Sequence, residues 1–206
     1  MAEARETGGG NRDGRPARRE RTAPRKITAA RLENMALYYL GRFSSSSGNL
    51  RRVLMRKVAR AAAAHGDDPD DGAKLIEELI ARYLSSGLID DRAYAAQKAA
   101  SLQRRGASRF GIRGKLRQKG VEGELVAEAI ETLDAASETS ELASACALAR
   151  RRRLGPYRPA AARRAAHDKD LATLARAGFR LDVARRVLKA ADVEALEILA
   201  RGEDES

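Results

Sequence analysis

Few residues in this chain of 206 have the types and the spacing that chemistry requires. Asp90 and Asp91 form an adjacent carboxylate pair, which could bind a metal ion or act as acid and base. Because the nearby sequence offers no third ligand and no histidine, helix capping by one of the two aspartates is the preferred interpretation. The single cysteine, Cys146, lies at helical spacing from Leu142 and Ala149, which predicts a buried thiol and not a nucleophile.

No other group of residues matches a catalytic pattern. His65 and His167 lie far apart in the sequence and are expected at the surface. We find no glycine-rich phosphate loop, no Cys/His cluster with metal spacing and no nucleophile placed beside a base. The sequence therefore predicts a protein that is not an enzyme, with no cofactor, no metal site and no small-molecule substrate.

The composition limits both the fold and the compartment. The chain is 43% hydrophobic but only 4% aromatic, so its core must be thin, which favours an elongated array of small helices. One cysteine excludes an internal disulfide and suggests a reducing compartment. No apolar run approaches the ~20 residues that cross a bilayer, and the N-terminus lacks the apolar segment of a secretory signal. These features predict a cytoplasmic protein without a membrane partner.

Charge is distributed in blocks. The net charge is +11, which points to a polyanionic partner. Residues 42–60, 104–119 and 150–164 are basic and contain no acidic residue, whereas 67–78 and 122–141 are acidic. A surface that is charged only for solubility usually mixes the two signs at short range. The segregation favours contact with nucleic acid or with an acidic protein surface.

The clearest basic block is residues 104–121. Its apolar residues Ile112, Leu116 and Val121 predict a helix that Ser108 caps and that stops at Gly120. Gly111 and Gly114 lie inside this helix, either because another backbone approaches closely or because the helix is locally weak. The predicted contact residues are the seven cations of this block and five of the cations in the two others: Arg104, Arg105, Arg109, Arg113, Lys115, Arg117, Lys119, Arg51, Arg52, Arg56, Arg163 and Arg164.

Apolar periodicity predicts helices throughout and no strands, so the fold class is all-α. Thr28 can cap the first helix, and a serine-rich turn precedes a second helix from near Asn49. Asp71 can cap the third helix, after a loop over 65–71. The last helix of the pattern is predicted at about 181–190.

The helices repeat. The repeated pattern consists of a helix, a glycine, one apolar residue and another helix. It recurs 58 residues after Leu116, Gly120 and Val121, and a shift of 62 residues relates the first two units. The prediction is three tandem three-helix repeats, at 27–89, 90–136 and 137–200. They are flanked by a disordered basic tail, 1–26, and a frayed acidic end, 201–206. The tail either adds weak attraction to polyanions or serves only solubility.

These residues resemble the signature of the RecX family. The resemblance rests on the run from Leu88 to Tyr94, on Arg105-Gly106, and on the spacing from Ile112 to Val121. It extends over roughly residues 30–190, although the serine turn is longer than usual and Ser108 replaces a frequent glycine.

The resemblance implies a cytoplasmic regulator of the RecA recombinase in DNA recombination, DNA repair and the SOS response. Family members bind the recombinase–DNA filament along its groove and inhibit or tune its ATPase and strand exchange. The basic blocks alone would also support a second hypothesis, direct binding of single- or double-stranded DNA through phosphate contacts.

Overall fold

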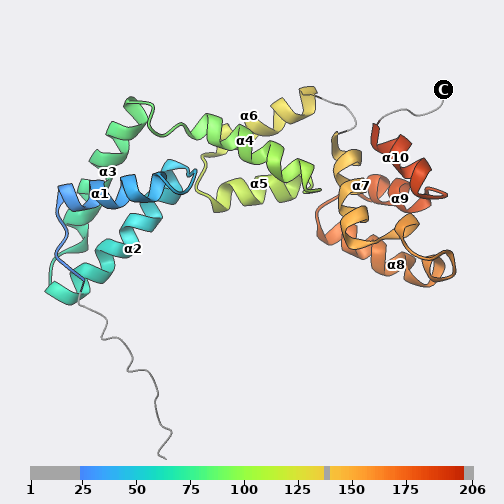
Figure 1. Ribbon diagram of the computed structural model, residues 1–206, viewed down its shortest axis with the longest axis horizontal. Coiled ribbons are helices and arrows are strands. Elements are labelled where there is room, and N and C mark those ends of the chain that lie inside the picture. Colours follow the sequence, from blue (N-terminus) through green and yellow to red (C-terminus); the bar gives the residue numbers. More distant parts are fainter. Residues whose placement is uncertain (1–23, 137–139, 202–206) are drawn as a thin grey trace, which may run out of the picture.

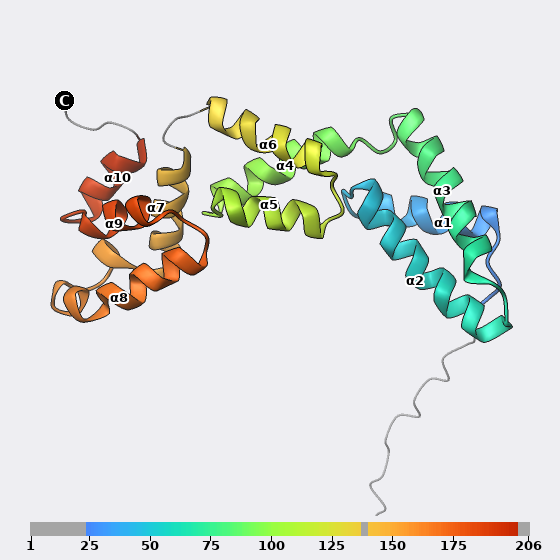
Figure 2. The same ribbon diagram turned by 180° about the vertical axis from the view of Figure 1, so that it is seen from behind.

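The computed structural model describes residues 24–136 and 140–201. Within these two ranges it contains ten α-helices, one short 3-10 helix and no strand. The helices form three groups that follow one another along an elongated molecule (Figures 1 and 2). The predicted all-α array is thus confirmed. The predicted tail and acidic end lie almost entirely outside the described residues, as does the start of the third predicted repeat.

Each group has its own core. The first core includes Leu50, Leu54 and Ile76, and the second is built around Ile112 and Leu116. The helices of the first group are α1 (Ala29–Leu40), α2 (Ser47–His65) and α3 (Pro69–Ser85). Those of the second are α4 (Asp91–Arg104), α5 (Arg109–Gln118) and α6 (Gly123–Ala136). Most core residues are Leu, Ile, Val or Ala, and few are aromatic. Each group therefore has a small core, as the scarcity of aromatic residues in the sequence predicted.

The third group is larger than the other two. Its helices are α7 (Ser140–Arg152), the 3-10 helix η1 (Gly155–Tyr157), α8 (Ala160–Arg176), α9 (Leu181–Lys189) and α10 (Val193–Arg201). Helix α10 is absent from the sequence prediction. Asp192 accepts a hydrogen bond from the Ala195 amide at 2.8 Å, and Leu196 is fully buried in the third core. An acidic cap and one apolar stripe in a nine-residue helix are a weak sequence signal.

The repeated glycine turns have the predicted geometry. Gly120 and Gly178 adopt positive φ angles of 74° and 86°, which L-residues with a Cβ rarely adopt. The next residue then folds back, so that the amide of Val121 donates to Leu116 O and that of Phe179 donates to Leu174 O, each at 3.2 Å. These Schellman-type ends place an apolar side chain under the helix that has just ended.

Three helix caps agree with the prediction and two helix starts differ. The side chains of Thr28, Asp90 and Ser108 accept the expected capping hydrogen bonds. Helix α2 begins at Ser47, capped by Ser46, because a run of serines offers several caps and the apolar pattern starts only later. Helix α3 is capped by Asp68 and not by Asp71, because Pro69 suits the first helical position and the first turn is polar.

Candidate partner-binding surface

The three basic helices α2, α5 and α8 follow one another in a row. The C-terminus of α8 meets the N-terminus of α5, and the C-terminus of α5 meets the N-terminus of α2 (Figure 1). All three therefore run in the same direction, with their helix dipoles aligned head to tail. We call this arrangement the second-helix row, since each helix is the second α-helix of its repeat.

The same serine contact joins the row at both places. Ser108 caps α5 by accepting from the Gly111 amide at 3.0 Å, and its hydroxyl donates to Ala177 O at the end of α8, at 2.5 Å. Ser46 caps α2, and its hydroxyl likewise donates to Lys119 O at the end of α5. Each hydroxyl thus satisfies one free amide and one free carbonyl from two different repeats.

Two further contacts hold the first and second repeats together. A Cβ on Gly48 would lie 2.3 Å from Gly120 O, so the two backbones approach as closely as glycine permits. The Asp91 carboxylate accepts hydrogen bonds from the amide of Ser47, at 2.7 Å, and from its hydroxyl. Asp91 therefore positions the first repeat on the second.

The adjacent aspartates have separate structural roles. Asp90 caps α4 by accepting from the Ala93 amide at 2.8 Å, which confirms the capping interpretation, while Asp91 bonds across the repeat boundary. Among the described residues no group of three histidine, cysteine, aspartate or glutamate side chains could hold a metal ion.

Eight of the twelve predicted contact residues have side chains with no ion pair or hydrogen bond to another described residue. Arg56 and Arg164 are exposed on α2 and α8, whereas Lys119, which follows α5, is half-buried. The full set is Arg56, Arg104, Arg105, Arg113, Lys115, Arg117, Lys119 and Arg164. Arg104 ends α4 and Arg105 follows it, while the other six belong to α2, α5 and α8 or directly follow α5, and they give the second-helix row its positive charge.

Two of the remaining four predicted contact residues, Arg109 and Arg51, form ion pairs with other helices. Arg109 forms ion pairs with Asp134 of α6, at 2.7 Å, and with Glu141 of α7, at 3.2 Å. It therefore ties the second repeat to the third. Arg51 holds Glu77 of α3 through two bonds of 2.5 and 2.7 Å, and this hydrogen bonding lowers the pKa of the Glu77 carboxyl.

Arg163 and Arg52 bond to backbone carbonyls. The Arg163 guanidinium donates to carbonyl oxygens of Pro156, Arg158 and Ala191, which fastens η1 and the segment before α10 to α8. Arg52 donates to Gln118 O across the first repeat boundary. We therefore assign Arg163, Arg52, Arg109 and Arg51 mainly to contacts within the protein. Helical periodicity alone could not separate these four from the other eight predicted contact residues.

Cys146 is buried in the core of the third repeat, as predicted. Burial raises the pKa of its thiol to about 11, although the Arg186 charge acts in the opposite direction. The thiolate is consequently scarce at neutral pH, which agrees with a structural role. No helix in the described part of the chain combines the length and apolarity that crossing a bilayer requires.

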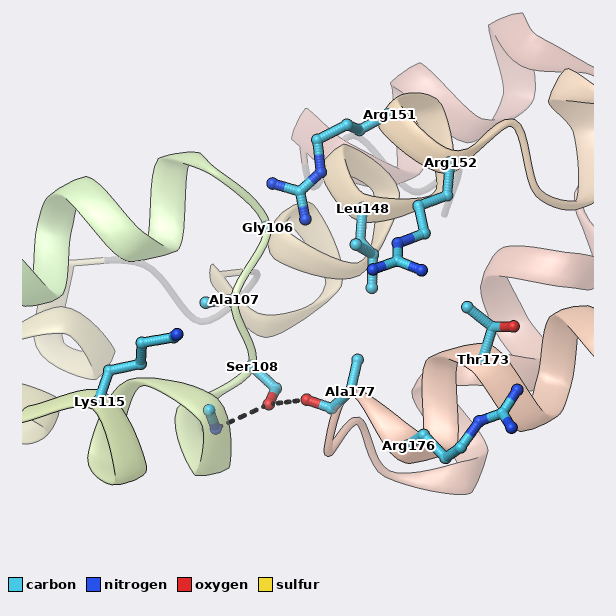
Figure 3. A pocket seen from close by; sticks show the side chains of 11 residues that line it. Gly106, Ala107, Ser108, Lys115, Leu148, Arg151, Arg152, Thr173, Arg176 and Ala177 are labelled. Atoms are coloured by element: carbon cyan, nitrogen blue, oxygen red, sulfur yellow. Dashed lines mark hydrogen bonds between the residues drawn. The ribbon is translucent and has the colours of Figure 1, made fainter. Parts of the chain in front are cut away.

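Other cations gather where the sequence prediction did not place a site. Arg151 and Arg152 end α7, and Arg176 ends α8. Together with Lys115 they line a cavity of about 340 Å³ between α5, α7 and α8 (Figure 3). The acid-free basic block 150–164 marks Arg151 and Arg152 in the sequence. Arg176 lies outside that block and shares the cavity only because of the tertiary fold.

An array of small helical repeats joined into a cationic row defines a class of helical-repeat proteins that offer a long contact surface. Comparison with known proteins names the family. The family model described as "RecX, second three-helix domain" matches residues 90–130, which lie within the second repeat.

Two relatives extend this match over most of the chain. "Regulatory protein RecX" of Myxococcus xanthus is 43% identical over 166 residues, which cover 80% of this chain and 88% of that protein. "Regulatory protein RecX" of Agrobacterium fabrum is 32% identical over 167 residues, covering 81% and 86%. The chain therefore belongs to the RecX family of regulatory proteins, and the expectation of a non-enzymatic regulator is confirmed. No solved structure matches the chain.

Proposed function

We propose that this protein binds the filament that the RecA recombinase forms on DNA, lies along the filament groove, and inhibits ATP hydrolysis and strand exchange. Such a regulator would act in the cytoplasm, in recombination, DNA repair and the SOS response. Membership of the RecX family supports the choice of partner, since two relatives carry the name "Regulatory protein RecX".

The observation that carries the proposal is the second-helix row. The cations in and beside it that have no partner among residues 24–136 and 140–201 are spread over three repeats, so they can contact a long partner at several places at once. Linked contacts of this kind strengthen binding far beyond the strength of each one. A groove between recombinase subunits on DNA would offer carboxylates and phosphates, and arginine binds both through paired, charge-assisted hydrogen bonds.

The test is the DNA-dependent ATPase of the cognate recombinase. Sub-stoichiometric wild-type protein is expected to suppress it. Reversing charge at Arg113→Glu and Arg117→Glu removes two exposed cations of α5 that have no partner in the described structure. Because each lost charge-assisted bond is worth about 1.5–3 kcal/mol, half-maximal inhibition should need at least ~10-fold more of the variant.

The matched control reverses two charges on α3, with Lys74→Glu and Arg82→Glu. Both side chains are well exposed, at 75% and 60%, and lie outside the second-helix row. Circular dichroism should show equal helix content in all three proteins. If the intact protein leaves the ATPase unchanged across a range of salt concentrations, the proposed function is wrong.

Direct DNA binding is a second candidate function, favoured by the same unpaired cations. It predicts binding to DNA without recombinase, and an affinity that falls steeply with salt as counterions are released. Titrating labelled single- and double-stranded DNA in the absence of recombinase separates the two functions. An ATPase effect without measurable DNA affinity would leave the protein filament as the sole target.

A further inference from the structure

The cavity between α5, α7 and α8 is surrounded by positive charge. Lys115 approaches from α5, Arg151 and Arg152 from α7, and Arg176 from α8 (Figure 3). No acidic side chain lines this cavity of about 340 Å³. We call it the junction pocket, because it lies where the second and third repeats meet.

Most donors in the junction pocket are available. Lys115, Arg152 and Arg176 are exposed, and their side chains have no ion pair or hydrogen bond to any residue within 24–136 or 140–201. Arg151 donates through one nitrogen to Arg105 O at 2.7 Å, which holds its guanidinium beside Gly106. In Figure 3 the Arg152 guanidinium extends over the space between α7 and α8.

The helix ends around the junction pocket carry both signs. Ser108 and Gly111 belong to the N-terminal end of α5, where the helix dipole is positive, but the Gly111 amide already donates to Ser108. Helices α7 and α8 end beside the same cavity with the negative ends of their dipoles, and the Ala177 carbonyl accepts the Ser108 hydroxyl at 2.5 Å. The case for an anion therefore rests on the four cations that line the cavity with no acidic side chain among them.

The arrangement fits a phosphate better than a protein carboxylate. One arginine fork saturates a carboxylate, which is planar and offers two oxygens. A tetrahedral phosphate has oxygens pointing in several directions and can accept from more than one of the cations that line the cavity from three helices. The cavity also has room for the sugar on either side of a phosphodiester, which an aspartate or glutamate side chain does not require.

We propose that the junction pocket is a phosphate-binding site whose contacting cations are Arg152, Arg176 and Lys115, with Arg151 held beside them. The phosphate comes from a nucleic-acid backbone, from a strand end or from free solution, and the pocket chemistry is the same for all three. The inference deepens the DNA-binding part of the proposed function. It is tested without recombinase, so its failure does not affect the ATPase test.

The decisive variant is the full chain with Arg152→Ala and Arg176→Ala. Its binding to fluorescein-labelled oligo(dT) lacking a terminal phosphate is measured by anisotropy over a range of salt. Affinity should fall by about tenfold, because two charge-assisted contacts are lost. The slope of log affinity against log salt should become shallower by about 0.7 for each phosphate contact removed.

A matched control removes the same charge elsewhere. Lys74→Ala with Arg82→Ala deletes two cations of α3, whose exposed ion pairs contribute little stability. This control should bind oligo(dT) like wild type. Equal helix content and equal thermal midpoints of both variants would show that the pocket substitutions leave the fold intact.

Two further arms separate the sources of the phosphate. Oligo(dT) with a 5′-phosphate tests a strand end, and inorganic phosphate titrated against chloride at equal ionic strength tests the free anion. A loss confined to one arm assigns the pocket to that source and supports the proposal. If the pocket variant and the α3 control behave alike in all three arms, the junction pocket is not a phosphate site.

Discussion

The two repeat boundaries share a serine contact and a close glycine approach but differ in the charges around them. At the first boundary Gly48 and Gly120 bring two backbones together, and Asp91 bonds to Ser47. At the second, a Cβ on Gly106 would lie 2.6 Å from the Leu148 amide nitrogen, so the backbones also approach closely there. The second boundary adds an ion pair from Arg109 of α5 to Glu141 of α7, and the cationic junction pocket lies beside it.

The hollows beside the two boundaries show the same contrast. The one at the first boundary, about 410 Å³, is lined largely by apolar side chains, among them Leu37, Phe43 and Leu88. The one at the second, about 340 Å³, is lined by four cations. Since screening by salt weakens charge contacts but not close packing, ionic strength should weaken the Arg109–Glu141 contact of the second boundary and leave the glycine contacts of both boundaries unchanged.

The largest effect is expected inside the third repeat. Asp170 is buried, bonds Arg158 at 2.7 and 2.8 Å and accepts from the Gly155 amide at 2.9 Å. Asp170→Asn leaves Arg158 without its counterion, which should lower the free energy of unfolding by about 3 kcal/mol. Urea unfolding followed by circular dichroism measures this, with exposed Asp168→Asn on the same helix as the control.

The same carboxylate makes the third repeat sensitive to acid. Burial alone would raise the pKa of Asp170, but hydrogen bonds from Arg158 and Gly155 and the Arg158 charge outweigh it and hold the pKa below its usual range. Its stabilising contribution is therefore present above the ordinary aspartate pKa of about 3.9 and is lost as pH falls through the lowered value. Asp170→Asn should lack this acid dependence; an unchanged pH profile would contradict the assignment.

An intermediate effect is expected at the first boundary. Gly48→Ala places a Cβ where only 2.3 Å separate it from Gly120 O, so the two repeats must shift apart. We expect unfolding free energy to fall by about 2 kcal/mol, with faster hydrogen exchange around Ser47. Gly114→Ala is the control, because its Cβ meets nothing within 4 Å; it should stabilise α5 by about 0.5–1 kcal/mol. Equal behaviour of the two variants would refute the close backbone packing.

The smallest effect is expected for the charge contacts of the second boundary. Arg109→Gln removes the ion pairs with Asp134 and Glu141, but the Arg109 side chain is 40% exposed and therefore screened. The loss should be at most about 1 kcal/mol in low salt, and it should disappear in high salt. Thermal unfolding of wild type and variant at two salt concentrations measures the difference, which a purely steric role of Arg109 would leave independent of salt.

Much of the fold could be predicted because its signals are local. Ile112, Leu116 and Val121 recur at helical spacing, and glycine after a helix marks a turn that other residues rarely adopt. The buried thiol of Cys146 followed from the same periodicity. Helix α10 was missed, because one buried leucine after a polar turn barely differs from a fraying end.

The candidate site was predictable only as a set of charges. The basic blocks marked α2 and α5, yet nothing in the sequence separates Arg113, which is exposed and unpaired among the described residues, from Arg109, which is tied to two acids. A Cβ on Gly111 would lie 3.7 Å from Ala177 O, an ordinary contact distance, and one on Gly114 would meet nothing within 4 Å, so close approach of another backbone explains neither glycine.

The sequence by itself determined the helices, their repetition and the segregation of charge, because periodicity, caps and glycine turns act within a few residues. The tertiary structure decided the order of the second-helix row, the pairing of Asp91 with Ser47 and the placement of Lys115, Arg152 and Arg176 around one cavity. These contacts join residues tens of positions apart, since Ser46 bonds to a carbonyl 73 residues away. Local propensity carries no information about such distant partners; packing between repeats supplies it.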